Sequence, residues 1–484
     1  MPASDVLALL PLIAVAAGSV AVMIAATFRS HALAAGLAAL SLAAAFALVP
    51  AVSPLSPRQV TPLLSVDRYA LFCMGLIFAS GFAVVLISFG YLRDRPDPKE
   101  EFYFFLLLAV LGSAVLAGSR HFASFFLGLE LLSVSLYAMV AYPREGDISL
   151  EAGLKYLILA GASSAFLLFG MALVYARCGT MEFVRPGASL SLAGGFRDAY
   201  LLAGLGLILA GAGFKLGVVP FHLWTPDVYE GAPAPATAFV ATVSKGAMAA
   251  LLLRYVVDAG AYDSPSALAA INVVAVASIL AGNLLALLQS NVKRILAYSS
   301  IAHLGYLLVA LAAGGPLAWE AVMFYLVAYF ITTLAAFGVV TVMSGPDRDA
   351  DAIDDYRGLF LRRPWLAGIF SAALLSLAGV PLTAGFVGKF YILAAGIRVE
   401  AWLPVVTLVL GSTIGLFYYL RIIVAVYSRL PGEGAGTAPF APAVPLAGIV
   451  TLAGLVLLLV GIGVYPAPLL RLIQAAAAGL VPGP

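Results

Sequence analysis

The sequence predicts an all-α, polytopic membrane protein of about fourteen transmembrane helices, with two inverted five-helix repeats that contain broken helices. Three observations predict this class. Of the 484 residues, 63% are hydrophobic and only 10% are charged, whereas a soluble protein carries about a quarter charged residues. Apolar runs of roughly 18 or more residues recur from end to end, each long enough to cross a ~30 Å hydrocarbon core. Two of these runs contain Gly and Pro, which break a helix.

The apolar runs and the polar breaks between them give the predicted spans. The first run lacks the charged start and the cleavage site of a signal peptide, so we expect it to remain as a span. The spans in chain order are residues 6–27, 32–50, 68–90, 101–118, 121–142, 152–175, 199–220, 234–257, 267–287, 293–313, 319–343, 365–395, 403–428 and 440–464. A last stretch, 467–480, is weakly amphipathic and too short to cross. The longest polar connection, 344–364, is expected outside the membrane.

Charge and cysteine content bear on topology and on possible partners. Loops after odd-numbered spans carry roughly thirteen Lys and Arg and the other side roughly nine, which places both termini on the outer side by the positive-inside rule. The net charge of +2 and the lack of a basic cluster give no sign of a nucleic-acid partner. Cys73 and Cys178 have no metal-binding spacing, so we interpret them as packing residues.

The two broken spans suggest an internal repeat. Residues 199–220 end in GVVP, and residues 365–395 contain SLAGVPLTAGFVGKFY. Helix breaks at membrane depth persist only where protein or a water-filled cavity covers them. The two broken spans lie five crossings apart, and a repeat of five crossings must invert, as in many transporters. We therefore predict one membrane domain, 1–484, composed of three N-terminal spans (1–100), a first repeat (101–258), a second repeat (267–428) and a last span (440–464).

Ionisable residues deep inside the spans are the candidate functional residues, because each costs at least ~2.5–3.5 kcal/mol at the centre of a span. Glu130, Lys215, Lys245 and Lys389 lie too deep to reach the headgroups easily, and His303 is central in AYSSIAHLGY. The alternative for the four charges is that Glu–Lys pairs only pin helices together. GFKLG around Lys215 is also a small-residue packing pattern. For His303 the alternative is a neutral, hydrogen-bonded packing residue.

Other polar residues lie nearer the ends of their spans. Lys155 and Arg421 fit snorkelling to the headgroups as well as they fit a buried role. His222, beside Trp224, fits an interfacial anchor equally well.

The chemistry of the deep residues suits a proton relay. Burial lowers the pKa of a lysine and a nearby carboxylate raises it, so moving a carboxylate by a few ångströms loads or empties the amine. No other chemistry competes in the sequence. GAGFKLG fails the dinucleotide-binding pattern because position 216 is Leu and no predicted strand precedes it.

Long motifs resemble one known family. GFKLGVVPFHLWTPDVYEGAPAPATAFVATVSKGAMAA and QSNVKRILAYSSIAHLGY resemble two signatures of the antiporter-like membrane subunits of respiratory complex I and of multi-subunit sodium/proton antiporters. FFLGLELLSVSLYAMVAY and EAGLKYLILAGASSAFLLFGMALVY are most similar to the subunit N branch of bacterial NADH-quinone oxidoreductases. Lys389, where the subunit M branch has Glu, and the short tail after the last span favour the same branch. The resemblance covers roughly residues 67–430. A sodium/proton antiporter subunit and a structural scaffold are the alternatives.

The resemblance implies a role for each candidate residue. Glu130 would tune Lys215, Lys245 would be the central relay lysine, and Lys389 would gate proton exit. Lys155, His222, Lys293 and His303 match polar positions of the family as supporting residues. The chain would be a subunit of a proton-translocating NADH:quinone oxidoreductase without a redox site of its own. The implied partners are subunits M, K and J, the lipid of the bacterial inner membrane, and a peripheral arm with FMN, iron–sulfur clusters and quinone chemistry.

Overall fold

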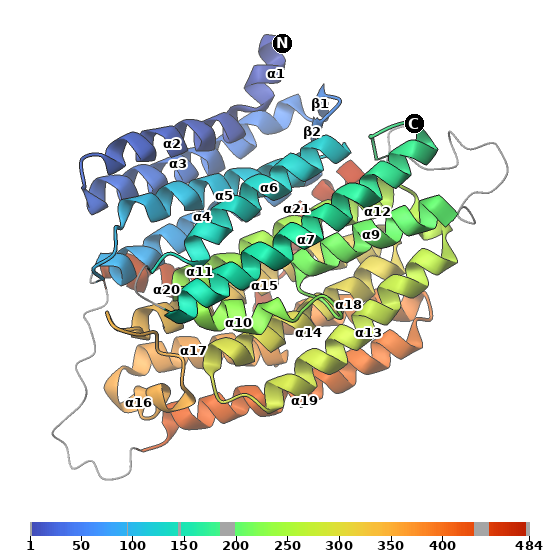
Figure 1. Ribbon diagram of the computed structural model, residues 1–484. Helices are drawn as coiled ribbons and strands as arrows, with labels where there is room; N and C mark the ends of the chain where they lie inside the picture. Colours follow the sequence, from blue (N-terminus) through green and yellow to red (C-terminus); the bar gives the residue numbers. More distant parts are fainter. Residues whose placement is uncertain (1, 94, 144–146, 184–198, 430–444, 481–484) are drawn as a thin grey trace.

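The chain folds into a bundle of long helices, several of which are enclosed by others. The computed structural model describes residues 2–93, 95–143, 147–183, 199–429 and 445–480. Figure 1 shows the helices lying side by side, with α2 and α3 at one edge of the bundle and α13 and α19 at the opposite edge. Within the described residues, twelve helices are long and apolar enough to cross a membrane. The predicted class of all-α membrane protein is confirmed.

The N-terminal part departs from the prediction in two places. Residues 6–27 are divided by a turn at Leu9 into two helices rather than forming one span. A short antiparallel hairpin, absent from the all-α prediction, precedes α4, and it pairs Arg58 with Val66 and Gln59 with Ser65. The elements are α1 (Ala3–Ala8), α2 (Leu10–Ala26), α3 (His31–Val52), η1 (Ser53–Leu55), β1 (Arg58–Thr61), β2 (Leu64–Val66) and α4 (Arg68–Arg93).

The middle of the chain contains the first predicted break. Helix α9 stops at Leu216, and a short helix that the sequence did not reveal, α10, follows it before the next span begins. That span changes to π-helical geometry at its centre. The elements are α5 (Glu100–Gly118), α6 (Phe122–Val140), α7 (Asp147–Cys178), α9 (Ala199–Leu216), α10 (Trp224–Gly231), α11 (Ala234–Phe239), η3 (Val240–Ser244), α12 (Lys245–Asp258) and η4 (Ala261–Asp263).

The C-terminal part contains the second predicted break, between α17 and α18. Residues 440–444 of the predicted last span lie outside the described part of the chain. The elements are α13 (Pro265–Leu287), α14 (Val292–Ala313), α15 (Gly315–Met343), η5 (Ile353–Tyr356), α16 (Leu359–Arg362), α17 (Pro364–Ala378), α18 (Ala384–Arg398), α19 (Trp402–Tyr427), α20 (Leu446–Val464), α21 (Ala467–Ala477) and η6 (Ala478–Leu480).

Burial separates central helices from peripheral ones. The segment from α11 to α12, together with α14 and α15, is almost completely covered by other helices. In contrast, α3, α7 and α20 leave most of their apolar surface uncovered, as expected for helices that face lipid. The helices that carry Lys245 and His303 therefore lie in the interior of the bundle.

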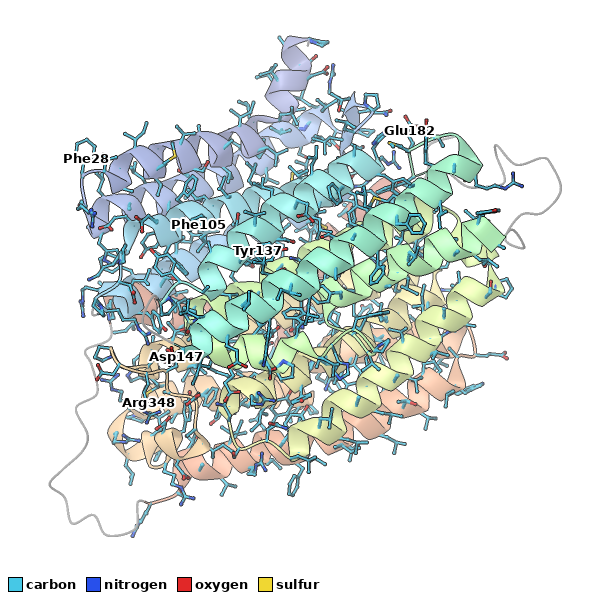
Figure 2. The ribbon with its side chains drawn as sticks, in the orientation of Figure 1. Phe28, Phe105, Tyr137, Asp147, Glu182 and Arg348 are labelled. Carbon is cyan, nitrogen blue, oxygen red and sulfur yellow. The ribbon has the colours of Figure 1, made fainter. Side chains whose placement is uncertain are left out.

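The bundle has two distinct ends. Figure 2 shows Asp147 and Arg348 at one end and Glu182 at the other. We call the first the loop end, because the connection from α15 to α17 lies there, and the second the hairpin end. At the hairpin end, isolated bridges join Leu64 to Ser119 and His121 to Glu182.

A buried ion pair joins the hairpin to the interior at the hairpin end. Arg254 of α12 is fully buried and donates to both carboxylate oxygens of Asp67, at 2.6 and 2.8 Å. The Tyr69 hydroxyl donates to the Ala250 carbonyl at 2.7 Å, and the Tyr69 ring lies 5.0 Å from the Arg254 guanidinium. Burial raises the pKa of Asp67, but the charge and hydrogen bonds of Arg254, together with the Ala70 amide and the charge of Arg120, lower that pKa below its ordinary value. The pair therefore fixes α12 against the start of α4.

We predict that Arg254→Met destabilises the protein by about 3–5 kcal/mol, because removing one partner strands the buried Asp67 carboxylate. Asp67→Leu combined with Arg254→Met should recover part of this loss, since neither charge remains. Thermal unfolding of the purified membrane complex measures both effects. A single variant as stable as the wild type would contradict the structural role of this pair.

Candidate proton-transfer site at two helix breaks

The first break is covered by protein. Gly217 has a positive φ of 70° and ends α9, and the chain is non-helical until α10 begins at Trp224. The indole of Trp224 donates to the Phe214 carbonyl at 2.9 Å, which also accepts from the Gly217 amide. The amide of Val219 donates to the Ser278 hydroxyl of α13 at 2.9 Å. These bonds satisfy backbone groups that would otherwise be costly at membrane depth.

Lys215, in the last turn of α9 before this break, is buried among hydroxyl groups. Its ammonium donates to the Ser133 hydroxyl of α6 and to the Tyr156 hydroxyl of α7, each at 3.0 Å. Glu130 accepts from the Ser164 hydroxyl at 2.5 Å. Both Glu130 and Lys215 are described by the structure, and no ion pair joins them there. The two residues nevertheless lie near the same part of α6, because Ser133, which accepts from Lys215, is one helical turn from Glu130.

Lys245 occupies the centre of the bundle at a change of helix geometry. It is fully buried and begins α12 directly after the π-helical turn η3, and π-turns are frequent at functional sites. Its ammonium donates to the Ser300 hydroxyl of α14 at 2.8 Å. The same ammonium lies 5.8 Å from the Trp224 ring and 5.2 Å from the Tyr229 ring. The Trp224 ring is 4.9 Å from that of Tyr156, so ring contacts connect the surroundings of the two lysines.

Hydroxyl groups continue from Lys245 toward His303. Ser300 also accepts from the Tyr329 hydroxyl at 2.7 Å. The imidazole of His303 hydrogen-bonds the Tyr325 hydroxyl through Nδ1 at 2.7 Å and the Tyr419 hydroxyl through Nε2 at 3.2 Å. Its ring centroid lies 5.7 Å from that of Tyr329. His303 is therefore held from α15 and α19, next to the hydroxyl cluster around Ser300.

Lys389 lies at the second break. Helix α17 ends at Ala378, and Gly379 has a positive φ of 86°. The Lys389 ammonium donates to the carbonyls of Leu377 and Ala378, at 2.8 and 3.0 Å, and to the Ser412 hydroxyl of α19 at 2.8 Å. A lysine at the C-terminal end of a helix also interacts favourably with the helix dipole.

The two breaks place a lysine ammonium against a glycine in the same way. A Cβ atom on Gly217 would lie 3.0 Å from Lys245 Nζ, and one on Gly379 would lie 3.2 Å from Lys389 Nζ. Only glycine combines a positive φ with this close approach. The ring of Tyr306 links the second break to His303, because it lies 5.1 Å from Lys389 Nζ and 5.3 Å from the His303 ring.

The other candidate residues lie apart from the set formed by Glu130, Lys215, Lys245, His303 and Lys389. The side chain of Lys155 is 44% exposed and pairs with Glu151 at 2.7 Å and Asp227 at 3.1 Å. His222 is half-buried in the linker before α10. Lys293 is buried at the loop end. Arg421 donates to the carbonyls of Leu287 and Gln289 at the end of α13.

Sequence reasoning missed the partners of the lysines. The hydroxyls come from other spans and are Ser133, Tyr156, Ser164, Ser300, Tyr325, Tyr329, Ser412 and Tyr419. A signal existed for Ser300, which precedes His303 by three residues and shares its helix face. A signal also existed for Arg254, a charge inside the predicted span 234–257.

The arrangement defines a class of protein. Among the described residues, no group of three or more His, Cys, Asp or Glu is placed to hold a metal ion. At the two breaks and between them lie amines, an imidazole and hydroxyls, all of which exchange protons. A helical membrane bundle with such a row at two helix breaks is an ion-translocating membrane protein.

Comparison with known proteins identifies the family. The family described as NADH:quinone oxidoreductase/Mrp antiporter, TM matches residues 119–415. The NADH-quinone oxidoreductase subunit N of Nitrosospira multiformis is 54% identical over 443 residues, which cover 87% of this chain and 86% of that protein. A chain of respiratory complex I from Thermus thermophilus has a TM-score of 0.81 at 33% identity, covering 96% of this chain and 99% of that one. A chain of the Mrp complex from Dietzia has a TM-score of 0.87 at 20% identity, covering 100% and 98%, and shares the fold.

The chain belongs to the family of NADH-quinone oxidoreductase subunit N. It is thus a membrane subunit of complex I, a multi-subunit, proton-translocating oxidoreductase. The alternative of a sodium/proton antiporter subunit corresponds to a more distant relationship, since the Mrp chain is only 20% identical.

We predict that Gly217→Ala lowers proton pumping in the assembled complex. The added methyl would lie 2.5 Å from Thr225 Oγ1 and 3.0 Å from Lys245 Nζ, and the positive φ costs a further ~1–2 kcal/mol. Gly206→Ala in α9 is the matched control, because nothing lies within 4 Å of its Cβ position. Proton uptake into vesicles, normalised to assembled complex, checks the difference. Equal pumping by the two variants would contradict the packing role of Gly217.

Proposed function

We propose that this chain moves protons through the membrane along a buried row of side chains, driven by quinone reduction elsewhere in the complex. The row is Glu130, Lys215, Lys245, His303 and Lys389. The observation that carries the proposal is the close spacing of the row: Lys215 is hydrogen-bonded to Tyr156, and the ring of Trp224 lies beside both Tyr156 and the Lys245 ammonium. Hydroxyl and ring contacts then lead from Lys245 through Ser300 and Tyr329 to His303.

The state of Glu130 supports a switching role. In the described structure it is bonded to Ser164, while Lys215 is bonded to Ser133 and Tyr156. A carboxylate that approaches a buried amine favours its protonated form, and one that withdraws favours release. A small movement of α6 against α9 would thus load or empty Lys215. The proton would then pass from Lys215 to Lys245 through the groups around the first break.

The second half of the row provides the exit. Lys389 keeps a hydroxyl partner, Ser412 on α19, beside its two carbonyl partners. A hydroxyl both accepts and donates a proton, whereas a carbonyl only accepts a hydrogen bond. Ser412 is therefore the group through which Lys389 would release its proton. Lys155, His222 and Lys293 are supporting residues in this proposal.

We also propose the setting of the chain. It would lie in the bacterial cytoplasmic membrane with both termini on the outer side. It would bind subunits M, K and J, and the FMN, iron–sulfur clusters and quinone would belong to partner subunits, including the peripheral arm. The paired glycines at the two breaks support the division into two inverted repeats, 101–258 and 267–428.

We predict that Lys215→Ala lowers proton pumping, and quinone reduction with it, without preventing assembly. Glu130→Gln should resemble it, because both variants remove the same switch. If the two residues act as one unit, the double variant loses about as much as the worse single variant. NADH-driven proton uptake into vesicles measures all three. Normal pumping by assembled Lys215→Ala, or strictly additive losses, would argue against the coupled switch.

We predict that Lys389→Glu retains substantial pumping, whereas Lys389→Arg and Lys389→Met lose most of it. The position requires an ionisable group whose pKa burial can tune, and either sign of charge satisfies this. Arginine fails because its pKa above ~12 keeps it protonated. The same vesicle assay, normalised to assembled complex, provides the measurement. An arginine variant that pumps like the wild type would mean that Lys389 is a fixed charge.

A further inference from the structure

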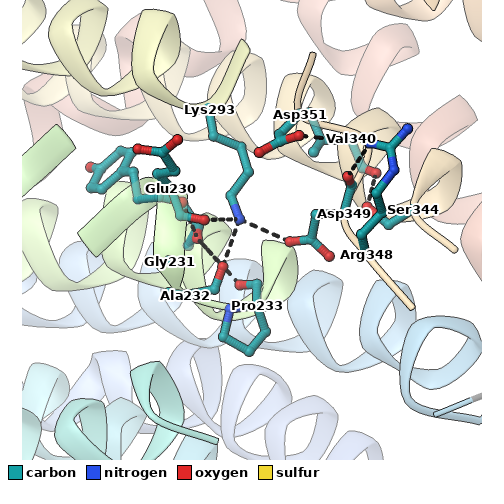
Figure 3. Close-up of polar contacts among 12 residues, drawn as sticks. Glu230, Gly231, Ala232, Pro233, Lys293, Val340, Ser344, Arg348, Asp349 and Asp351 are labelled. Carbon is teal, nitrogen blue, oxygen red and sulfur yellow. Dashed lines mark hydrogen bonds and ion pairs between the residues drawn. The ribbon is translucent and has the colours of Figure 1, made fainter. Parts of the chain in front are cut away.

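Lys293 begins α14 at the loop end, and its surroundings differ from those of the relay lysines. It is 1% exposed, and its ammonium donates to the carbonyls of Glu230 and Ala232 at 2.8 and 2.7 Å. The third bond goes to the carboxylate of Asp349 at 2.8 Å. Figure 3 shows these three bonds leaving the ammonium in different directions. An ammonium has three donors, so all three are used.

Two of these three acceptors are backbone carbonyls, which are not suited to pass a proton onward. Backbone carbonyls do not take up protons at working pH. The ammonium bonds of Lys215 and Lys245 go only to hydroxyls, and Lys389 keeps one hydroxyl partner. Lys293 has no hydroxyl among its acceptors. By the chemistry of its partners, Lys293 is a fixed cation.

Asp349 is held as a permanent anion. Its second carboxylate oxygen accepts from the Tyr91 hydroxyl of α4 at 2.7 Å and from Arg95, which lies just beyond that helix, at 2.8 Å. Burial raises the pKa of Asp349, but the charges of Lys293 and Arg95 and the hydrogen bonds from Lys293 and Tyr91 together lower that pKa below its ordinary value. Asp349 therefore remains charged at neutral pH and joins α4 to α14.

The carbonyls that Lys293 binds lie at the junction between α10 and α11. Glu230 and Ala232 flank the end of α10, where its unpaired carbonyls and the negative end of its dipole meet α11. This junction connects the break after Lys215 to the segment that carries Lys245. Neighbouring bonds from α14 reinforce it, because Arg294 donates to Asp227 at 3.0 Å and to Glu230 at 2.6 Å.

We propose that Asp349 and Lys293 form a clamp that positions the α10–α11 junction, and with it the spacing of Lys215 and Lys245, without themselves transferring protons. The clamp rests on the proposed function, because its effect is felt through the two relay lysines. In this proposal Lys293 positions the α10–α11 junction, whereas the family resemblance implies that it supports the proton relay. The clamp also adds Asp349, from a loop outside the spans, as a positioning residue.

The test compares pumping by assembled complex I that carries one substitution in this subunit. Asp349→Asn should lower NADH-driven proton uptake about fivefold or more, a typical size for coupling between sites. Lys293→Met should act similarly. Lys293→Arg should retain most activity, because an arginine keeps the charge and the donors but never releases its proton. A relay lysine would fail the same replacement.

The matched control is Asp354→Asn in the same loop. Asp354 pairs with Arg357 at 2.6 Å, but its side chain is 76% exposed, so this variant should pump like the wild type. Pumping by Asp349→Asn equal to that of Asp354→Asn would overturn the clamp. Normal pumping by Lys293→Met would also overturn it, since the junction would then not need the bonds from Lys293.

A relay variant keeps the two proposals separable. Lys245→Ala should abolish pumping if the chain translocates protons through its lysine row. If Lys245→Ala pumps normally, the proposed function fails. If Lys245→Ala is inactive while Asp349→Asn is unaffected, only the clamp fails.

A milder variant covers the case in which Asp349→Asn does not assemble. Tyr91→Phe removes one hydrogen bond to Asp349 and keeps both charges of the pair. Hydrogen exchange at the amides of Ala232 and Thr237, which close the end of α10 and the first turn of α11, should become faster in this variant. Exchange and pumping both identical to the wild type would overturn the clamp.

Discussion

The structure depends on one constraint: an ammonium group enclosed by apolar helices must find fixed acceptors, or its burial costs more than the fold can tolerate. Many of the acceptors in this protein are backbone carbonyls. Lys389 binds the carbonyls at the end of α17, and Lys293 binds those at the end of α10. Each of these helix ends has unpaired carbonyls and the negative pole of a helix dipole. Breaking a helix in the interior therefore creates the site that a buried lysine needs.

The same constraint explains the architecture around the breaks. Freed backbone groups persist at membrane depth only when protein covers them, and here α14 and α15 lie almost entirely inside the bundle. Among their polar side chains are the hydroxyls of Ser300 and Tyr329 and the imidazole of His303, which form the cluster next to Lys245. The glycines at both breaks let the ammonium groups approach the backbone. The broken helices are thus stable only because other helices cover them, and the covering helices supply hydroxyl partners for the buried lysines.

The sequence predicts the parts of this arrangement that are local. Apolar runs indicate the spans, and Gly and Pro inside them mark both breaks, because helix propensity acts over a few residues. Partners are set by packing between distant segments and are not local: Glu130 lies with Ser164, and Lys293 with Asp349. The hairpin before α4 and the short helix α10 were missed for a related reason, since each is stabilised by contacts with segments far along the chain. The sequence predicts where the buried lysines lie but not which groups accept their hydrogen bonds.

Burial alone does not distinguish a proton-transferring cation from a fixed one. Arg254 is as deeply buried as Lys245, yet it binds a single carboxylate through two bonds and stays protonated at any working pH. The useful distinction is the chemistry of the acceptors. Hydroxyls can pass a proton, whereas carbonyls and a permanently paired carboxylate hold it in place. On this criterion the buried cations fall into two sets: Lys215 and Lys245 belong to the proposed transferring groups, and Lys293 and Arg254 have the acceptors expected of fixed ones. The second set lies at the two ends of the bundle, on either side of the proposed proton path.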